Sequence, residues 1–291
     1  MGESYSTGRA QSPMIAQPET HSAVADHYAR ESLIAAIRDG LAAMGKTEST
    51  VTAEDLSPVD EFHIGGREAT VALAGQLALA AGDRVLDIGC GLGGPARQIA
   101  AHYGCHVTGI DLTRDYVEAG NTLSGWLHLK DRVSLQQGNA LALPFADGSF
   151  AAAYMLHVGM NIADKRGLFS EVARVLRAGA RLGVYDVMRT GEGELAYPLP
   201  WASTPETNAI AAPAQYREAL SAAGFEIISD RNRRDVALNY FAQQRAKVAT
   251  GPTALGVQTL MGARRPQMVG NMIESISAGR IAPVEIIARR R

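Results

Sequence analysis

A glycine-rich turn is the segment of the chain best suited to bind a ligand. Residues 85–94 read Val-Leu-Asp-Ile-Gly-Cys-Gly-Leu-Gly-Gly, a short apolar run that ends in glycines. Glycines let a backbone approach a ligand closely, and a helix that begins after them presents free N–H groups. We therefore expect Gly89, Cys90 and Gly91 to contact a ligand. Gly89, Gly91 and Gly94 also fit the dinucleotide pattern G-x-G-x-x-G, which alone is a weak signal.

Two carboxyl groups near this turn restrict the chemistry of the ligand. Asp87 ends the apolar run, where it would repel a pyrophosphate and attract a cation. S-adenosylmethionine is such a ligand, because it carries an ammonium and a sulfonium. Asp111 ends the next apolar run, and a carboxylate there can accept hydrogen bonds from both ribose hydroxyls. Since Asp111 fits NAD equally well, a nicotinamide-dependent oxidoreductase remains an alternative.

The elements that must position these residues alternate along the chain. Short apolar runs and segments of helical periodicity follow one another from residue 84, which is typical of right-handed crossovers and parallel strands. We therefore predict an α/β fold with a doubly wound, seven-stranded, mostly parallel sheet. The expected strands are 84–88, 105–110, 132–136, 150–155, 181–187, 225–229 and 281–288. The expected helices between them are 95–103, 114–128, 164–177 and 213–223.

The segments outside this alternation predict a tail, a cap and an insertion. Residues 1–20 show little hydrophobic periodicity, which predicts a flexible tail. Apolar residues recur at helical spacing over 22–44, 67–80, 236–249, 253–262 and 266–278. A loop-like stretch with Pro58, Gly65 and Gly66 precedes the second of these helices. The assigned units are a tail at 1–20, an N-terminal helical cap or lid at 21–66, and a cofactor-binding domain at 67–291 with an acceptor-pocket loop at 188–205 and a helical insertion at 236–279.

Composition excludes several classes of partner. The 291 residues are 46% hydrophobic and carry a net charge of −2, so nucleic acid and anionic membranes are poor partners. No run of 18 apolar residues predicts a membrane span, and no secretory leader is evident. Two cysteines cannot form a disulfide framework, so we expect a reducing, cytoplasmic setting. A small-molecule acceptor is the expected partner, and a homodimer is an option that the sequence leaves open.

Further blocks give the chain a family resemblance. Residues 143–145 read Leu-Pro-Phe, residues 149–150 read Ser-Phe, and residues 171–177 read Glu-Val-Ala-Arg-Val-Leu-Arg. With the glycine turn and residues 109–111, their order resembles the class I S-adenosylmethionine-dependent methyltransferases over about residues 60–230. The resemblance is greatest to small-molecule enzymes: sarcosine/dimethylglycine N-methyltransferases, natural-product sugar O-methyltransferases, and quinone or tocopherol C-methyltransferases.

The resemblance implies a role for each matching residue. Asp87 and the turn at Gly89–Gly91 would lie by the methionine part of S-adenosylmethionine, and Asp111 would bind its ribose. Leu112 would lie against the adenine, and Leu156 beside the cofactor after the fourth strand.

One cofactor position departs from the family pattern. Asn139-Ala140 stands where the family often has Asp-Ala. The Asn139 amide oxygen can still accept from the adenine amine, with less charge assistance. A turn cap is the alternative role for Asn139.

A segment before the first strand resembles a lid over the cofactor. Within residues 59–70, Phe62 or His63 would cover the sulfonium, and filling a gap between helix and sheet is the alternative role for both. Tyr28 is a second candidate cover, with core packing as its alternative.

On the acceptor side this chain departs from the pattern of its relatives. Many relatives carry an acid at position 157 and a histidine at position 161, where this chain has His157 and Asn161. An imidazole can take a proton near neutral pH, so His157 is the better base, although a lone histidine is more often structural. The candidate catalytic residues are His157, Asp186 and His63. The candidate acceptor-binding residues are Met160, Asn161, Tyr185 and Trp201.

These patterns predict in-line transfer of a methyl group to a small molecule. The donor methyl is already activated, so the protein has mainly to align the reactants and exclude water. No histidine, cysteine or acid cluster has metal-ligand spacing, and no metal is expected. By resemblance we favour N-methylation of a small amine, with O- or C-methylation of a secondary metabolite as the alternative. An inactive cofactor-binding subunit is a more remote alternative.

Overall fold

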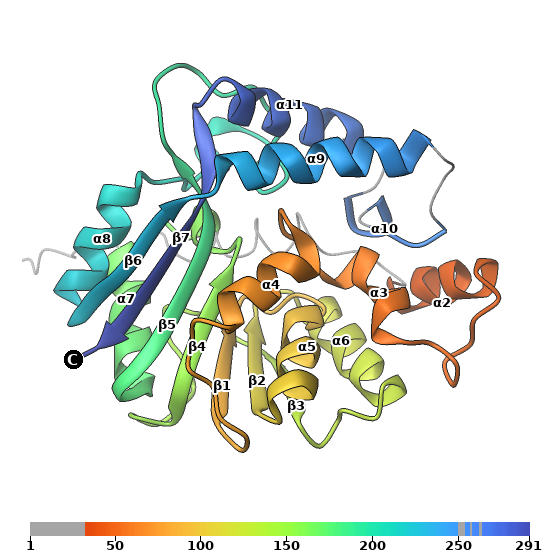
Figure 1. Ribbon diagram of the computed structural model, residues 1–291, viewed down its shortest axis with the longest axis horizontal. Coiled ribbons are helices and arrows are strands. Elements are labelled where there is room, and N and C mark those ends of the chain that lie inside the picture. The colour runs from red at the N-terminus through yellow and green to blue at the C-terminus, as the bar shows by residue number, and fades with distance from the viewer. Residues whose placement is uncertain (1–32, 250–253, 257, 262–263) are drawn as a thin grey trace, which may run out of the picture.

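The computed structural model describes residues 33–249, 254–256, 258–261 and 264–291. Tyr28 and the expected tail at 1–20 lie outside these residues. A seven-stranded sheet forms the centre, with the strand order β3-β2-β1-β4-β5-β7-β6 (Figure 1). The strands are β1 (Arg84–Ile88), β2 (His106–Asp111), β3 (Val133–Gln137), β4 (Phe150–Leu156), β5 (Leu176–Arg189), β6 (Phe225–Asn232) and β7 (Ile281–Arg290).

Neighbouring strands are parallel except at β7. β1 pairs in parallel with β2 and with β4, while β7 runs antiparallel to both β5 and β6. The order of strands therefore reverses between β1 and β4, which creates a crevice at the carboxyl ends of these strands. The predicted mostly parallel, seven-stranded α/β fold is confirmed.

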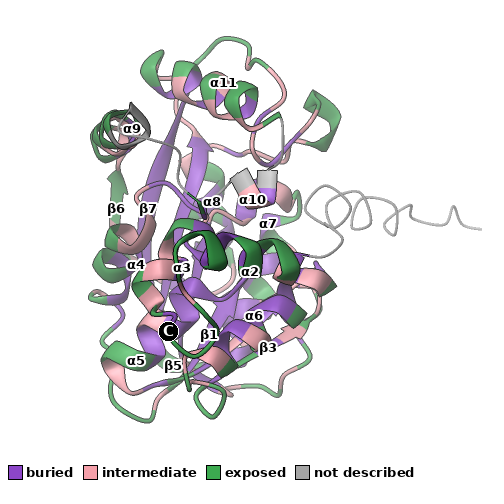
Figure 2. Cartoon of the chain, turned by 90° about the vertical axis from the view of Figure 1, so that its right-hand side faces the viewer, coloured by how far each residue is buried: buried purple, intermediate pink, exposed green. Residues whose placement is uncertain are grey.

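Helices cover both faces of the sheet, because alternate residues of each strand point to opposite sides. On β1, Val85 packs with α4 and α5, whereas Leu86 and Ile88 pack with α7 and α8. Figure 2 shows the buried residues concentrated on the strands and on the inner sides of the helices. The covering helices are α4 (Gly66–Ala74), α5 (Gly94–Tyr103) and α6 (Arg114–Trp126) on one face, and α7 (Lys165–Val175) and α8 (Pro213–Ala222) on the other.

Two further groups of helices lie around the crevice. α2 (Leu33–Ala43) and α3 (Ala53–Asp60) pack beside α6 through Leu56, Val59 and Leu123. α9 (Arg234–Ala249), α10 (Gln258–Met261) and α11 (Arg265–Ser277) come between β6 and β7. In Figure 1, α9 and α11 lie above the sheet, and α10 lies beside α2 and α3. None of the described helices is long and apolar enough to cross a bilayer.

Several boundaries differ from the sequence prediction. The stretch expected as a loop contains α3, which begins with a capping box between Thr52 and Asp55. Pro58 lies inside α3 and cannot donate to the Glu54 carbonyl, and the Ser57 hydroxyl donates to that oxygen at 3.0 Å. The helix expected over 67–80 ends at Ala74, and β5 begins at Leu176, five residues before the predicted strand.

A buried ion pair fastens α3 to the sheet domain. Arg97 Nη2 lies 2.6 Å from Asp60 Oδ2, and the two side chains are 1% and 4% exposed. Arg97 Nη1 also donates to the Gly120 carbonyl and the Ser124 hydroxyl of α6. Gly94 permits this contact, because a Cβ there would lie 2.2 Å from the Asp60 carbonyl oxygen.

Removing one partner of this pair should destabilise the protein strongly. Arg97→Met leaves Asp60 buried without its counter-charge, which is expected to lower the free energy of unfolding by about 3–5 kcal/mol. Arg166→Met removes an exposed pair with Glu218 and should change it by less than about 1 kcal/mol. Urea denaturation of both variants measures the difference, and equal losses would contradict the assignment.

Candidate cofactor and acceptor site

A cavity of about 2130 Å³ lies at the carboxyl ends of the parallel strands, under α9 and α11. The glycine turn after β1 and the end of β2 contribute to its wall, as do the turns after β3 and β4. The predicted site residues that line it are Phe62, His63, Asp87, Gly89, Cys90, Gly91, Asp111, Leu112, Asn139, Ala140, Leu156, His157, Met160, Asn161 and Trp201. Tyr185 and Asp186 are not among the lining residues.

The glycine turn is held against the end of β2. The Ile110 carbonyl accepts from the N–H groups of Gly89 and Cys90 at 2.8 and 3.0 Å. Gly91 has φ +50°, and a Cβ on it would meet no described atom within 4 Å. The turn therefore presents bare backbone to the cavity at Gly91, as close approach of a ligand requires.

Asp111 is fixed by the backbone around it. Its Oδ2 accepts from Gly91 N–H at 2.9 Å and its Oδ1 from Thr113 N–H at 2.8 Å. Burial raises the pKa of this carboxyl, and these backbone donors oppose the shift. Each carboxylate oxygen keeps acceptor capacity beyond one bond, so Asp111 can still accept from a diol.

Asp87 is a buried carboxyl with an unused acceptor. It is 2% exposed, and its Oδ2 has no hydrogen-bond partner among the described residues. Burial raises the pKa of Asp87 to about 7, and the nearby Tyr154 hydroxyl offsets this only in part. A cation in the cavity would stabilise the ionised form.

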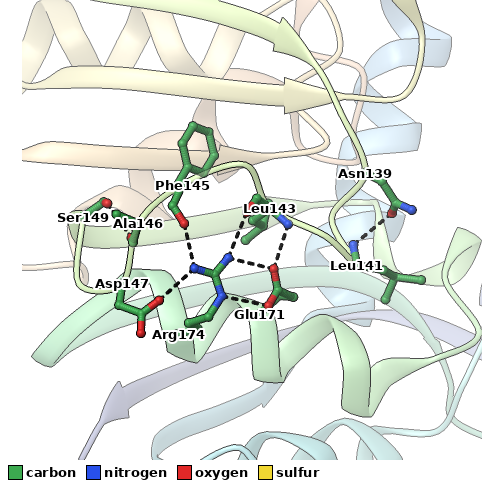
Figure 3. A network of polar contacts seen from close by, with 9 residues as sticks. All are labelled: Asn139, Leu141, Leu143, Phe145, Ala146, Asp147, Ser149, Glu171 and Arg174. Atoms are coloured by element: carbon green, nitrogen blue, oxygen red, sulfur yellow. Dashed lines mark hydrogen bonds and ion pairs between the residues drawn. The ribbon is translucent and has the colours of Figure 1, made fainter.

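The loop after β3 is clamped from α7. Arg174 donates to the carbonyls of Phe145 and Leu143 at 2.6 and 2.9 Å and pairs with Asp147 and Glu171 (Figure 3). Glu171 in turn accepts from Leu143 N–H at 2.8 Å.

Asn139 caps a turn within this clamped loop. Its Oδ1 accepts from Leu141 N–H at 2.9 Å, which is the alternative role that the sequence left open. Its Nδ2 keeps two donors, and Ala140 lines the cavity beside it.

Two histidines lie together on the acceptor side. The rings of His63 and His157 are 6.0 Å apart, and His157 stacks on Tyr185 at 5.3 Å. His157 has φ +57°, a conformation uncommon for non-glycine residues and often found at functional sites. Burial lowers the pKa of His63 to about 4 and that of His157 well below its usual value. Both rings are therefore neutral near pH 7 and are weak bases.

Asp186 is hydrogen-bonded to the turn that follows β4. Its oxygens accept from Val158 N–H at 2.7 Å, Gly159 N–H at 3.0 Å and the Tyr216 hydroxyl at 3.0 Å. It is completely buried, and burial raises its pKa to about 6. These bonds fix the turn that follows β4, so Asp186 positions His157 and Met160 from outside the cavity.

Trp201 forms part of the cavity wall in the loop after β5. Its Nε1 donates to Asn208 Oδ1 at 2.9 Å, and Asn208 Nδ2 donates to the Tyr197 hydroxyl at 2.8 Å. Trp201 is 3% exposed, so the indole is both an anchor of this loop and a cavity wall.

Cys90 of the glycine turn packs against Gly109, where a Cβ would lie 2.7 Å from the Cys90 sulfur. The Cys90 side chain is therefore tightly packed.

Sequence reasoning missed the polar group next to His63. Glu61 lines the cavity, is 4% exposed and accepts from the Thr70 hydroxyl at 2.7 Å. Two signals in the sequence could have identified Glu61: the capping box of α3 and the adjacent acids Asp60 and Glu61. Together they place an acid at the start of the lid segment.

Comparisons with known proteins agree with this geometry. Residues 85–179 match a family model described as a methyltransferase domain. The O-methyltransferase resE of Aspergillus sclerotiorum is 37% identical over 134 residues, which are 46% of this chain and 51% of that protein. A sterol 24-C-methyltransferase of Eremothecium gossypii is 33% identical over 176 residues, 56% of this chain and 45% of that protein. The chain spans about half or less of the length of the curated relatives that it matches.

Solved structures share the fold. The [4+2]-cyclase SpnF superposes with a TM-score of 0.62 at 26% identity, covering 76% of this chain and 80% of that one. A geranyl diphosphate methyltransferase in complex with S-adenosylmethionine gives 0.62 at 25% identity, covering 77% and 84%.

Residues 85–179 therefore carry a methyltransferase domain, and the strand order and the glycine turn with its two acids fit the class I S-adenosylmethionine-dependent type. The curated relatives include O-methyltransferases and sterol 24-C-methyltransferases. The residues present fit this cofactor, because Gly91 is open to the cavity and Asp87 holds an unused buried acceptor.

Cofactor binding should weaken as pH falls through the pKa of Asp87. A cation binds the ionised carboxyl, and its pKa of about 7 predicts that affinity for S-adenosylmethionine falls about tenfold from pH 8 to pH 6. Calorimetry should show weaker and nearly pH-independent binding by Asp87→Asn, and wild-type behaviour by Asp131→Asn, whose side chain is exposed. A wild-type affinity that does not change with pH would contradict this role.

Loss of the contacts that hold the loop after β3 should lower the affinity for the cofactor without changing the pH dependence of binding. Arg174→Ala removes three polar contacts to the loop, and we expect S-adenosylhomocysteine to bind about five- to tenfold more weakly. Arg177→Ala, an exposed arginine at the start of β5, is the matched control. Unchanged affinity in Arg174→Ala would show that the clamp does not position the cofactor loop.

Proposed function

We propose that this protein transfers the methyl group of S-adenosylmethionine to the nitrogen of a small-molecule amine with a large apolar part. The observation that carries the methyl-transfer assignment is the buried, unpartnered Asp87 oxygen beside the open glycine turn. A carboxyl in that position favours a cationic ligand over a pyrophosphate.

The apolar part of the acceptor is inferred from the far wall of the cavity. That wall combines the segment between α3 and α4, the turn after β4, the loop after β5, α9 and α11. Its apolar side chains include Ile64, Met160, Trp201, Phe241, Met272 and Ile273. Apolar walls with a few polar groups are typical of small-molecule sites. The cavity of about 2130 Å³ is large enough for a cofactor and a sizeable acceptor together.

An amine is favoured because the two histidines of the cavity are weak bases. Methylation of a hydroxyl needs a group that removes its proton, and His63 and His157 both have lowered pKa values. Asp186 is held by three hydrogen bonds of the fold. A neutral amine attacks with its own lone pair, so it needs no strong base in the transition state.

The residues of this chain would then align and shield the reactants. S-adenosylmethionine supplies the electrophilic methyl group when bound. Asp111 would orient the ribose, Asp87 would balance positive charge, and the clamped loop at Asn139 and Ala140 would hold the adenine. The lid segment with Phe62 and His63 would exclude water from the reacting atoms. The alignment of the two reactants would supply most of the rate increase.

O- or C-methylation is the second candidate, because the curated relatives include O-methyltransferases and sterol C-methyltransferases. The nicotinamide alternative has no support in the matched family. A neighbour named as a [4+2]-cyclase shares the fold, so transfer itself needs a direct test.

Labelled transfer tests the proposed reaction. With methyl-labelled S-adenosylmethionine, octylamine and N-methyloctylamine should gain label while 1-octanol does not. Asp111→Ala should lower the transfer at least about tenfold through weaker cofactor binding, whereas the exposed Asp131→Ala should not. Label in the alcohol alone would replace N- by O-methylation, and binding of the cofactor without transfer to any amine would support the inactive-subunit reading.

A further inference from the structure

A buried carboxyl in the cavity wall has an acceptor that the fold leaves unused. Glu61 begins the lid segment between α3 and α4, and its side chain is 2% exposed. Its Oε2 accepts from the Thr70 hydroxyl at 2.7 Å, but its Oε1 has no hydrogen-bond partner among the described residues. An unmade hydrogen bond on a buried carboxyl is costly, so it indicates a missing donor.

The neighbouring groups fix the direction of the hydrogen bonds. His63 Nε2 lies 3.0 Å from the Gly66 carbonyl, so this nitrogen carries the proton and donates. His63 therefore cannot accept from Thr70, although its Nε2 lies 3.2 Å from the Thr70 hydroxyl oxygen. The single hydroxyl proton of Thr70 goes to Glu61. His63 thus donates to Gly66, Thr70 donates to Glu61, and Glu61 is the acceptor that ends the group.

No lysine or arginine of the described chain forms an ion pair with Glu61. Arg97 pairs with Asp60 at 2.6 Å, and Arg67 pairs with Glu54. The other charged or titratable groups that act on or face Glu61 are His63, Tyr154 and Tyr240. Burial, and then the charge of Asp60, raises the pKa of Glu61 to about 8, against the effects of Thr70, Arg67 and Arg97. A cationic ligand would supply the counter-charge that the fold omits.

We propose that Glu61 binds the acceptor as an ammonium ion and takes its proton before methyl transfer. This inference rests on the proposed N-methylation and names the residue that selects the amine. An N–H bond of the ammonium breaks and an O–H bond forms on Oε1, which leaves the nitrogen lone pair free. That lone pair forms the new N–C bond while the C–S bond breaks and its electron pair remains on sulfur. Thr70 positions Glu61 through the hydrogen bond to Oε2.

The geometry suits this proton transfer. Glu61 belongs to the same cavity wall as His63, and the His63 ring lies 6.0 Å from that of His157. A carboxyl whose proton affinity is raised toward that of an alkylamine can accept an ammonium proton at a small cost, whereas an exposed carboxylate would hold it poorly.

Binding of a quaternary ammonium isolates this role from turnover. Octyltrimethylammonium has no proton to give, so any proton released on binding comes from the protein. Titration of the S-adenosylhomocysteine-saturated protein at pH 7, in two buffers of different ionisation enthalpy, should show release of about one proton by wild type. Glu61→Gln should bind the cation at least about tenfold more weakly and release none. Glu118→Gln, on the exposed face of α6, should match wild type.

A second pair of variants keeps the test independent of any folding defect in Glu61→Gln. Thr70→Val removes the hydroxyl that stabilises the ionised carboxyl, so its affinity for the cation should reach a maximum at higher pH than in wild type. Thr70→Ser restores the hydroxyl and should restore the wild-type profile.

Three outcomes separate the possibilities. No binding of the cation by wild type, or unchanged binding and proton release in Glu61→Gln, would overturn the inference. Weaker S-adenosylhomocysteine binding in Glu61→Gln, with unchanged binding of the cation, would also overturn it, because Glu61 would then serve the cofactor. Absence of S-adenosylhomocysteine binding by wild type would instead overturn the proposed function.

Discussion

The site depends on buried carboxyl groups with which no lysine or arginine of the described residues forms an ion pair. Asp87 and Glu61 each keep one oxygen without a partner, and the pKa of each is raised by burial. Such groups destabilise a fold unless a ligand compensates them, so their persistence is best explained by function. The nearby Arg97 offsets the burial of these carboxyl groups only in part, because it is paired with Asp60 and bound to α6. The capacity of the cavity to become negatively charged when a cation binds is therefore a property of the fold.

The ion pair between Asp60 and Arg97 also determines where the lid can be. Asp60 ends α3 and directly precedes Glu61, so the pair fixes one end of the lid segment to α5. At the other end, Gly66 begins α4, which packs on the sheet. The segment between them is short and is held at both ends. The cavity-lining residues Glu61, Phe62 and His63 thus share one anchored stretch of chain.

The sheet and the cofactor side were predictable because their signals are local. Apolar runs set the strands, and the acids that end β1 and β2 reach the cavity as expected. Asn139 lines the cavity, although its amide oxygen accepts a hydrogen bond within a turn. The acceptor side depends on contacts distant in sequence, which periodicity does not encode. Asp186 is an example, since its partners lie 27 to 30 residues away.

Local signals were also overlooked. The capping box at Thr52 predicts a helix start, but Pro58 concealed the helix α3 that follows it. Glu61 could be seen as a charged residue, yet only the fold brings Thr70 against it.

The antiparallel last strand has an evolutionary consequence. β6 ends where β7 begins, since Asn232 pairs with Val284 and Arg233 N–H donates to the Pro283 carbonyl. The chain between β6 and β7 therefore leaves the sheet and returns to it at the same point, as an inserted segment. Natural or laboratory recombination between homologues can therefore exchange that segment, which lines part of the cavity, while the parallel strands β1 to β5 are inherited intact.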